Sequence, residues 1–172
     1  MSTLPTVSTA RPPDFSSREF RDSLGMFATG VTIVTLRTAS GEPLGLTVNS
    51  FNAVSLNPPL VLWSLSKSGG SLAAFSQGQR YAVHVLRADQ TALALQFASR
   101  QTDRWAGVPY RDSACGVPLL DGVAATFECF NRSQYDEGDH VIFVGEVERC
   151  SHQPEAAPLL YHGGKFYTEP LR

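Results

Sequence analysis

Apolar positions follow a helical period only near the start of the chain. Phe20, Leu24 and Phe27 fall on one face of a helix, and residues 16–19 fit the S-x-x-E capping box that marks a helix N-terminus. The next glycine in a position to stop this pattern is Gly30. The sequence therefore predicts one amphipathic helix that starts after residue 16 and ends at Gly30.

After this helix, short runs of β-branched and aromatic residues dominate, and turn residues separate them. The runs predict strands at residues 31–36, 44–48, 60–65, 81–86, 123–131, 140–147 and 159–167, the last with a turn at Gly163-Gly164. Two helices are expected between them, one over residues 71–75 that stops at Gly78 and one capped by Asp89. Because strands and helices do not alternate regularly, the pattern predicts a mainly β protein, an antiparallel Greek-key-like β-barrel with a few short helices, and not a doubly wound sheet.

The length of 172 residues fits one compact domain. Residues 1–15 are mostly small and polar and carry too little apolar surface to offset the entropy of ordering them. We therefore expect a flexible N-terminal tail over residues 1–15 and a single domain over residues 16–172.

Charge and cysteine content exclude several classes of function. The net charge is −2, so no broad cationic surface is available for nucleic acid or for an anionic membrane. The three cysteines form no C-x-x-C pair, and the cysteines and histidines show no metal-ligand spacing, so we expect a reduced cytoplasm and no metal site.

Residues 43–66 lack charge but contain several Asn and Pro residues, which argues against a transmembrane helix. No secretion signal is apparent at the N-terminus.

The block at residues 45–59 is the first candidate for chemistry. It places neutral Asn, Ser and Thr side chains among apolar neighbours and contains no charge. Such a surface suits a flat heterocycle with polar edges, because amides and hydroxyls can address ring carbonyl and N–H groups. The same composition is also typical of a turn-rich strand exit.

Two further segments are candidates with equally plain structural alternatives. Residues 66–71, Ser-Lys-Ser-Gly-Gly-Ser, precede a predicted helix and offer hydroxyls, backbone N–H groups and a lysine for a phosphate, or else form a flexible linker. His140 follows Gly138 and Asp139 at the start of a predicted strand, where it is placed to contact a ligand. A histidine there is also common as an edge residue.

Taken in order, these segments resemble the short-chain NAD(P)H:flavin oxidoreductases, which are the reductase components of two-component flavin-dependent monooxygenases. The resemblance extends over residues 20–167. The matching stretches are residues 28–35, 47–55 with Pro58-Pro59, 81–86, 138–140 with Gly145-x-Val147, and 158–161. The resemblance implies a flavin-binding split β-barrel and a homodimer.

The resemblance also implies roles for particular residues. Thr47, Val48, Asn49 and Ser50 should line the isoalloxazine ring, with Ser55 close by. The flavin phosphate should be held by Lys67, Ser68 and Ser71, and the cofactor should be flanked by Phe97, Ala98 and Arg104. His140 matches a histidine beside the nicotinamide, and Tyr167 lies near a C-terminal aromatic that can flank it.

The implied reaction is hydride transfer from nicotinamide C4 of NADH or NADPH to N5 of FMN or FAD, after which reduced flavin leaves for a separate monooxygenase. Two alternatives remain open: a split-barrel oxidoreductase that keeps its flavin, and a flavin carrier without catalysis. The sequence departs from the family at His84, where Asn is frequent, and at Asn57, where Asp is common. If His84 points toward the cofactor, flavin preference or affinity could differ.

Overall fold

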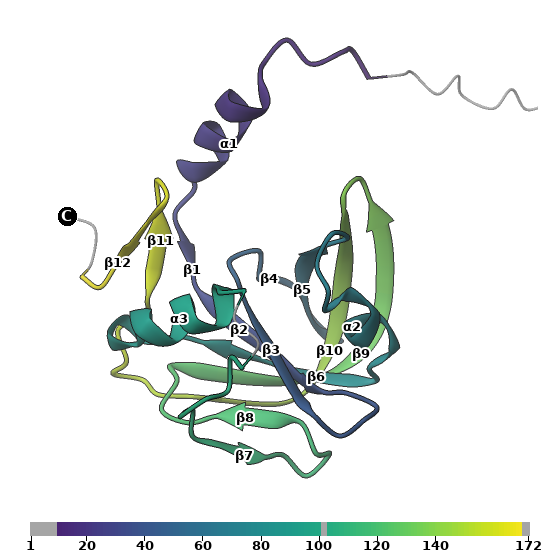
Figure 1. The fold of residues 1–172 in the computed structure, drawn as a ribbon, viewed down its shortest axis with the longest axis vertical. Coiled ribbons are helices and arrows are strands. Elements are labelled where there is room, and N and C mark those ends of the chain that lie inside the picture. The colour runs from purple at the N-terminus through teal and green to yellow at the C-terminus, as the bar shows by residue number, and fades with distance from the viewer. Residues whose placement is uncertain (1–9, 101–102, 170–172) are drawn as a thin grey trace, which may run out of the picture.

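The computed structural model describes residues 10–100 and 103–169, whose regular secondary structure is mainly antiparallel strand (Figure 1). Most of the predicted N-terminal tail, residues 1–9, lies outside the described residues. Residues 10–15 are exposed and belong to no helix or strand. The boundary of the tail stays a prediction.

The described residues contain short helices and twelve strands. The helices are α1 (Ser17–Gly25), α2 (Leu72–Gln77), the 3₁₀ helix η1 (Ala88–Gln90) and α3 (Thr91–Ala98). The strands are β1 (Thr29–Gly30), β2 (Thr32–Arg37), β3 (Pro43–Val48), β4 (Asn52–Leu56), β5 (Pro59–Ser66), β6 (Arg80–Val85), β7 (Tyr110–Asp112), β8 (Pro118–Leu120), β9 (Ala125–Glu137), β10 (His140–His152), β11 (Leu160–His162) and β12 (Lys165–Tyr167).

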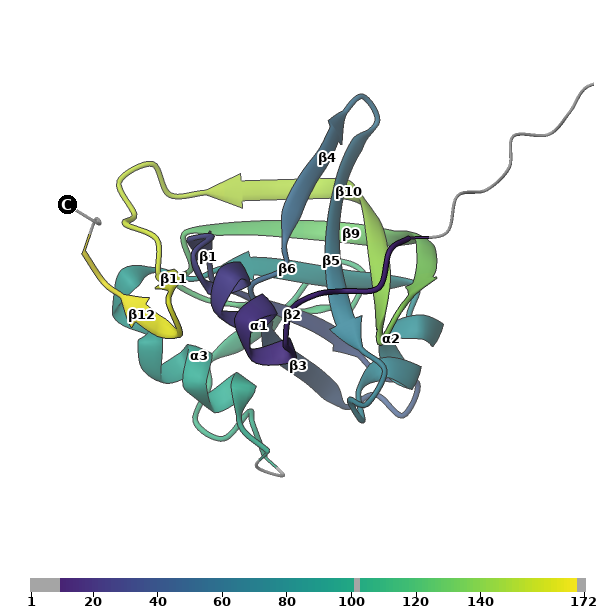
Figure 2. The ribbon, with the colours of Figure 1, turned by 90° about the horizontal axis from the view of Figure 1, so that it is seen from above.

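Seven of the strands form one curved sheet with the order β3-β2-β6-β9-β10-β5-β4. All of its neighbouring strands run antiparallel. Of the two small sheets, β7-β8 lies against it through contacts of β8 with β2 and β6, and β1-β11-β12 stands at one end of the barrel beside α3 (Figures 1 and 2). The mainly β, antiparallel barrel predicted from the sequence is confirmed.

The strands that the sequence did not predict have weak patterns. β1 has two residues and β7 and β8 have three each, which is too short for a periodic signal. The residues of β4 are exposed except for half-buried Ser55, because β4 is the outer strand of a hairpin that projects from the barrel (Figure 2). An edge strand without a buried face shows no alternation of apolar and polar residues.

The Ser50 side chain connects the end of β3 to β5, which lie toward opposite edges of the curved sheet. Ser50 lies between β3 and β4, and its hydroxyl accepts a hydrogen bond from the Ser64 backbone N–H at 2.9 Å. The same hydroxyl lies 3.2 Å from the Ser64 carbonyl oxygen, to which it donates. The side chain of Ser50 thus bonds the backbone of β5 next to the groove described below.

Aromatic side chains fill the barrel. Trp63 is fully buried and stacks on Phe143 with 4.7 Å between ring centroids, and Phe75 packs edge-on against it at 5.0 Å. A second cluster, which includes Ile33, Leu86 and Phe97, lies between the barrel and α3. These two clusters fix the positions of the strands and of α3 relative to one another.

The first helix begins where predicted but ends earlier. Ser16 and Glu19 form the capping box, with the Glu19 carboxylate 2.8 Å from the Ser16 N–H. The helix ends at Gly25, not at Gly30, because Thr29 and Gly30 form β1 and pair with β11. Phe27 therefore lies beyond the helix, and α1 has no buried residue.

The predicted cap of the later helix is also wrong. Asp89 belongs to η1, and α3 begins at Thr91, after Gln90. The Asp89 carboxylate instead accepts a hydrogen bond from the guanidinium of Arg87 at 2.8 Å. The Asp89 side chain is therefore bonded to Arg87 and does not cap α3.

His84 points into the core, where backbone groups of β2 and β8 bond both of its ring nitrogens. It is fully buried, and its Nε2 accepts a hydrogen bond from the Leu120 N–H of β8 at 3.2 Å. Nδ1 is therefore the protonated nitrogen, and it donates to the Ile33 carbonyl at 3.0 Å. Burial lowers the pKa of His84 to about 4, so the imidazole is neutral near pH 7.

Candidate functional site

A groove along the end of β3 contains much of the predicted flavin site. Its first part, the α3 hollow, has a volume of about 260 Å³. The hollow is lined by Val31, Thr47, Val48, Asn49, Ala98, Tyr161 and Phe166. Four of these, Thr47, Val48, Asn49 and Ala98, are residues that the sequence assigned to flavin.

The second part of the groove, the α1 hollow, is larger, at about 840 Å³. It opens between α1 and the β11-β12 hairpin on one side and β5 and β10 on the other. It is lined by Arg21, Asp22, Leu24, Gly25, Phe27, Thr29, Asn49, Ser50, Ser64, His140, Tyr161, Gly163 and Gly164. This hollow therefore includes Ser50 and the predicted catalytic residue His140.

Asn49 and Tyr161 line both hollows, so the two adjoin along these side chains. The Thr47 hydroxyl donates to the Ala94 carbonyl at 2.7 Å, which fixes the end of β3 against α3. The groove thus has neutral amide and hydroxyl groups on one side and aromatic rings on the other. This combination suits a flat heterocycle with polar edges.

The structure places Phe97 and Arg104 beside the groove as supports. Phe97 is fully buried, and a Cβ on Gly45 would come within 2.5 Å of its ring, so Gly45 allows α3 to pack against β3. Arg104 donates to the Ser99 carbonyl at 2.8 Å and to the Gly45 carbonyl at 3.2 Å. These contacts join the end of α3 to β3.

Tyr167 and Ser55 line neither the α3 hollow nor the α1 hollow. Tyr161 and Phe166 are partners in the β11-β12 ladder, and their rings lie 5.3 Å apart facing the groove. Tyr167 is the next residue along β12 and packs near His162 on the other face of the hairpin, at 6.2 Å. Ser55 is half-buried on β4. Their roles toward flavin or nicotinamide stay predictions.

His140 begins β10 and is half-exposed in the α1 hollow. Its Nδ1 donates to the Asp139 carboxylate at 2.7 Å, which leaves Nε2 available to a ligand. This hydrogen bond lowers the pKa of Asp139. Asp139 therefore keeps its negative charge and orients the ring.

The predicted phosphate loop begins at the end of β5, next to His140. Ser66 pairs with His140 in the β5-β10 ladder. Lys67 and Ser68 are exposed and Ser71 is half-buried, and the Ser68 hydroxyl lies 2.9 Å from that of Ser66. The loop and the α1 hollow therefore meet at one end of the barrel, and the role of the loop toward phosphate stays a prediction.

Sequence reasoning missed several groove residues. Tyr161 lay in a quoted family stretch without an assigned role, and Phe166 lay beside the predicted Tyr167. Ser64 looked like part of a continuous buried strand. The position of α1 beside the groove could not be predicted either. The Gly163 N–H donates to the Gly25 carbonyl at 2.8 Å, and this bond joins segments that are far apart in the sequence.

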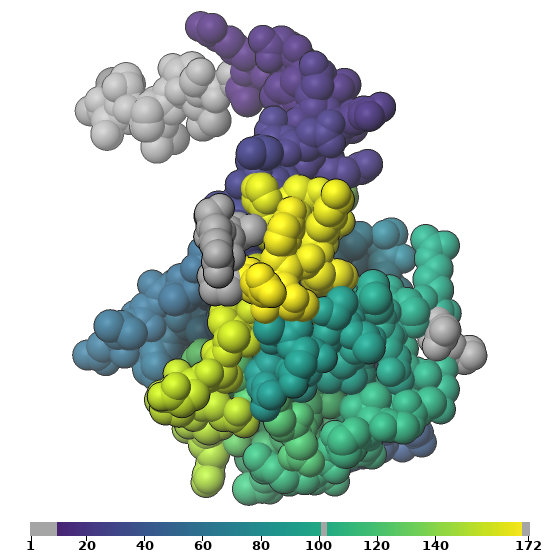
Figure 3. Space-filling view, turned by 90° about the vertical axis from the view of Figure 1, so that its left-hand side faces the viewer, coloured from purple at the N-terminus to yellow at the C-terminus, as the bar shows by residue number. Residues whose placement is uncertain are grey.

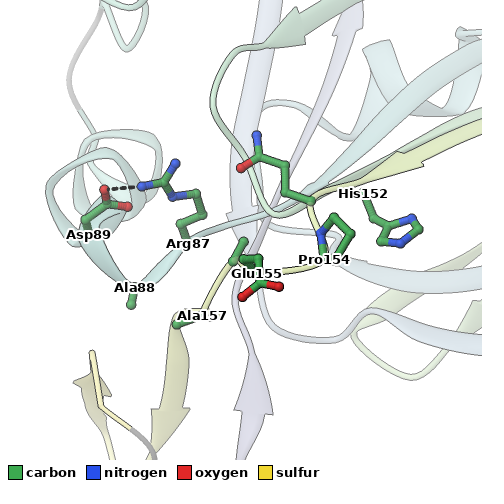
Figure 4. A pocket seen from close by; sticks show the side chains of 9 residues that line it. Arg87, Ala88, Asp89, His152, Pro154, Glu155 and Ala157 are labelled. Atoms are coloured by element: carbon green, nitrogen blue, oxygen red, sulfur yellow. Dashed lines mark hydrogen bonds and ion pairs between the residues drawn. The ribbon is translucent and has the colours of Figure 1, made fainter.

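Another hollow lies away from this groove, between η1 and residues 152–157. It has a volume of about 680 Å³ and includes Arg87, Asp89, His152 and Glu155. Figure 4 shows the Arg87 guanidinium turned toward Asp89, with which it forms an ion pair. None of the predicted site residues lines it, so the groove is the stronger candidate.

Residues 10–100 and 103–169 contain neither a candidate membrane-spanning helix nor a candidate metal site. No helix there has the length and apolar character needed to cross a membrane. In the same residues, no group of three or more His, Cys, Asp or Glu side chains is arranged to hold a metal ion.

The family model described as "Flavin reductase like domain" matches residues 24–170, which include every residue of both hollows except Arg21 and Asp22. The chain belongs to the flavin reductase-like family. The resemblance seen in the sequence is therefore confirmed.

Individual flavin reductase relatives match over most of the chain. The FMN reductase (NADH) SmoA of Agrobacterium fabrum (strain C58) is 46% identical, over 90% of this chain and 87% of the relative. The flavin-dependent monooxygenase reductase subunit HsaB of Rhodococcus jostii (strain RHA1) is 40% identical, over 87% and 76%. Two other flavin reductase relatives are longer, and the chain spans 43% and 48% of their lengths.

A solved flavin reductase shares the fold. The structure of the Streptomyces globisporus C-1027 NADH:FAD oxidoreductase SgcE6 in complex with NAD and FAD fragments has a TM-score of 0.85 and 38% identity, and the match covers 92% of this chain and 96% of that chain. The split-barrel class expected from the resemblance is thus confirmed. The residues of the groove also fit a flavin, because its hydroxyls and amides match polar ring edges and its apolar side chains match ring faces.

Proposed function

We propose that this protein is an NAD(P)H:flavin oxidoreductase that reduces FMN or FAD. The observation that carries the proposal is that Asn49 and Tyr161 join the predicted flavin residues of the α3 hollow to His140 in the α1 hollow. One groove therefore has a place for a flavin ring and, next to it, a place for a nicotinamide.

The cofactors supply the redox chemistry, as a hydride passes from nicotinamide C4 to flavin N5. The protein positions the two rings and excludes water. Thr47, Val48, Asn49 and Ser50, with Ser55 nearby, bind the flavin ring, while Phe97, Ala98 and Arg104 fix its flank. Lys67, Ser68 and Ser71 bind the phosphate. His140 contacts the nicotinamide through Nε2.

Relatives support a place in a two-component system. One similar protein is named as the reductase subunit of a flavin-dependent monooxygenase, and another as an NADH-dependent FMN reductase. We propose that this protein supplies reduced flavin to a separate monooxygenase in the cytoplasm. The exposed free thiols of Cys115 and Cys150 fit a reducing compartment.

We also propose a homodimer. The apolar face of α1 is open to solvent, with Leu24 59% exposed and Phe27, just beyond the helix, 73% exposed, and α1 stands above the body of the molecule (Figure 3). A nine-residue helix without tertiary packing is marginal in water. Light scattering during gel filtration should give twice the chain mass, and a monomer at micromolar concentration would refute the dimer.

The activity is tested by following NADH and NADPH oxidation by the purified protein with FMN, FAD or riboflavin, and without flavin. Rapid oxidation that requires added flavin establishes the reductase and ranks the cofactors. Flavin that binds without any NAD(P)H oxidation would favour the carrier instead. A flavin that remains bound through gel filtration would favour an oxidoreductase that keeps its cofactor.

A further inference from the structure

The lysine expected to bind phosphate already has partners in the protein. Its ammonium forms an ion pair with the Asp136 carboxylate and donates to the Gly138 carbonyl at 2.7 Å. The Lys67 backbone N–H also donates to the Asp139 carbonyl, at 2.9 Å. The turn between β9 and β10 therefore holds Lys67 beside His140, which follows that turn.

The ion pair is of a kind that exchanges partners easily. The side chain of Lys67 is 36% exposed and that of Asp136 is 75% exposed. Ion pairs at such exposure contribute little, because water and salt screen them. The terminal phosphate of FMN has more charge than a carboxylate, whereas each phosphate of FAD has one charge, and both accept the same N–H donors. Phosphate and Asp136 thus compete for one ammonium group.

We propose that Asp136 sets the affinity of the site for phosphorylated flavins by competing for Lys67. This inference rests on the proposed function, because it takes the phosphate of FMN or FAD as the competing ligand. Asp136 weakens binding of the phosphate and leaves binding of the ring unchanged. A weakened phosphate contact favours release of the reduced flavin, which suits a reductase that passes its product to another protein.

The neighbouring residue provides a matched control. Asp136 and Glu137 are adjacent at the end of β9, where they pair with Val141 and His140. Successive residues of a strand face opposite sides, so the Glu137 carboxylate points away from the side on which Asp136 meets Lys67. Glu137→Gln removes the same charge from the same turn without freeing Lys67.

The experiment measures dissociation constants for FMN and for riboflavin, which lacks the phosphate, by quenching of flavin fluorescence at low ionic strength. Asp136→Asn should tighten FMN binding about two- to fivefold, which corresponds to the loss of one exposed ion pair. Riboflavin binding should be unchanged. Glu137→Gln should leave both constants close to those of the wild type.

A double-mutant cycle isolates the competition for Lys67. In a Lys67→Gln background, Asp136→Asn should no longer tighten FMN binding. The proposal is overturned by unchanged FMN affinity in Asp136→Asn, by an equal gain in Glu137→Gln, or by a gain that persists without Lys67. If the wild-type protein binds FMN in any of these cases, the proposed function still stands. If the wild-type protein binds no flavin, both the competition proposal and the proposed function are overturned.

Discussion

His140 lies directly opposite Ser66 in the antiparallel ladder between β10 and β5. Ser66 is followed at once by Lys67, so the residue expected beside the nicotinamide and the loop expected at the phosphate are fixed to each other by backbone hydrogen bonds. Such a ladder does not rearrange during a catalytic cycle without breaking the sheet. The two ends of the proposed site are therefore preorganised.

Replacement of His140 should impair turnover more than flavin binding. His140→Ala removes the proposed Nε2 contact to the nicotinamide, and loss of one such hydrogen bond corresponds to about a tenfold fall in NADH-dependent kcat/KM. The FMN dissociation constant should change far less. His152→Ala, in the hollow of Figure 4, is the control and should turn over like the wild type. Unchanged turnover in His140→Ala would remove His140 from the site.

The two tyrosines of the C-terminal hairpin should behave differently. Tyr161→Leu removes the ring shared by both hollows, and the loss of about 1 kcal/mol of aromatic packing should weaken FMN binding about fivefold. Tyr167→Leu, on the other face of the hairpin, should affect FMN binding much less. Fluorescence titration compares the two. A larger effect of Tyr167→Leu would mean that this residue, and not Tyr161, contacts the cofactor.

Gly45→Ala should damage both stability and flavin binding. The new Cβ would lie 2.5 Å from the Phe97 ring and 3.3 Å from Trp105, so α3 must shift away from β3. Overpacking of this kind costs about 1–3 kcal/mol. Urea unfolding should show that loss, together with weaker FMN binding. Gly30→Ala, where an added Cβ meets nothing within 4 Å, serves as the control. Equal stabilities of these two variants would contradict the close approach of α3.

Buried His84 should make stability depend on pH. Burial lowers the folded-state pKa of His84 to about 4, whereas an unfolded histidine titrates near 6.5. As pH falls through this window, the unfolded chain binds a proton that the folded chain does not. Stability is therefore full above about pH 6.5 and falls on acidification, by about 2 kcal/mol at about pH 5.

The His84 contribution is isolated by comparison with His84→Gln, which does not titrate but keeps a donor and an acceptor. Urea unfolding of both proteins at several pH values gives the difference in slope. The wild type should lose stability faster than His84→Gln below about pH 6.5. Parallel slopes would show that the imidazole is not held neutral in the core.

The sequence was informative where local chemistry decides the structure. The capping box at Ser16 and the long β-branched strands depend on neighbours in the chain, and the order of motifs was enough to indicate the family. The end of α1 could not be predicted, because pairing of Thr29 with Tyr161 depends on a contact across more than 130 residues. The place of Tyr161 in the groove depends on the same long-range pairing.

The central claim is tested most directly by mixing the protein anaerobically with FMN and NADH and following the visible absorbance of the flavin. If the groove positions the two cofactors as proposed, the flavin bleaches much faster with the protein than without it, and His140→Ala slows this step. The reduced flavin should then pass through a membrane that retains the protein. Bleaching at the rate of the protein-free mixture, in protein shown to bind FMN, would contradict the account.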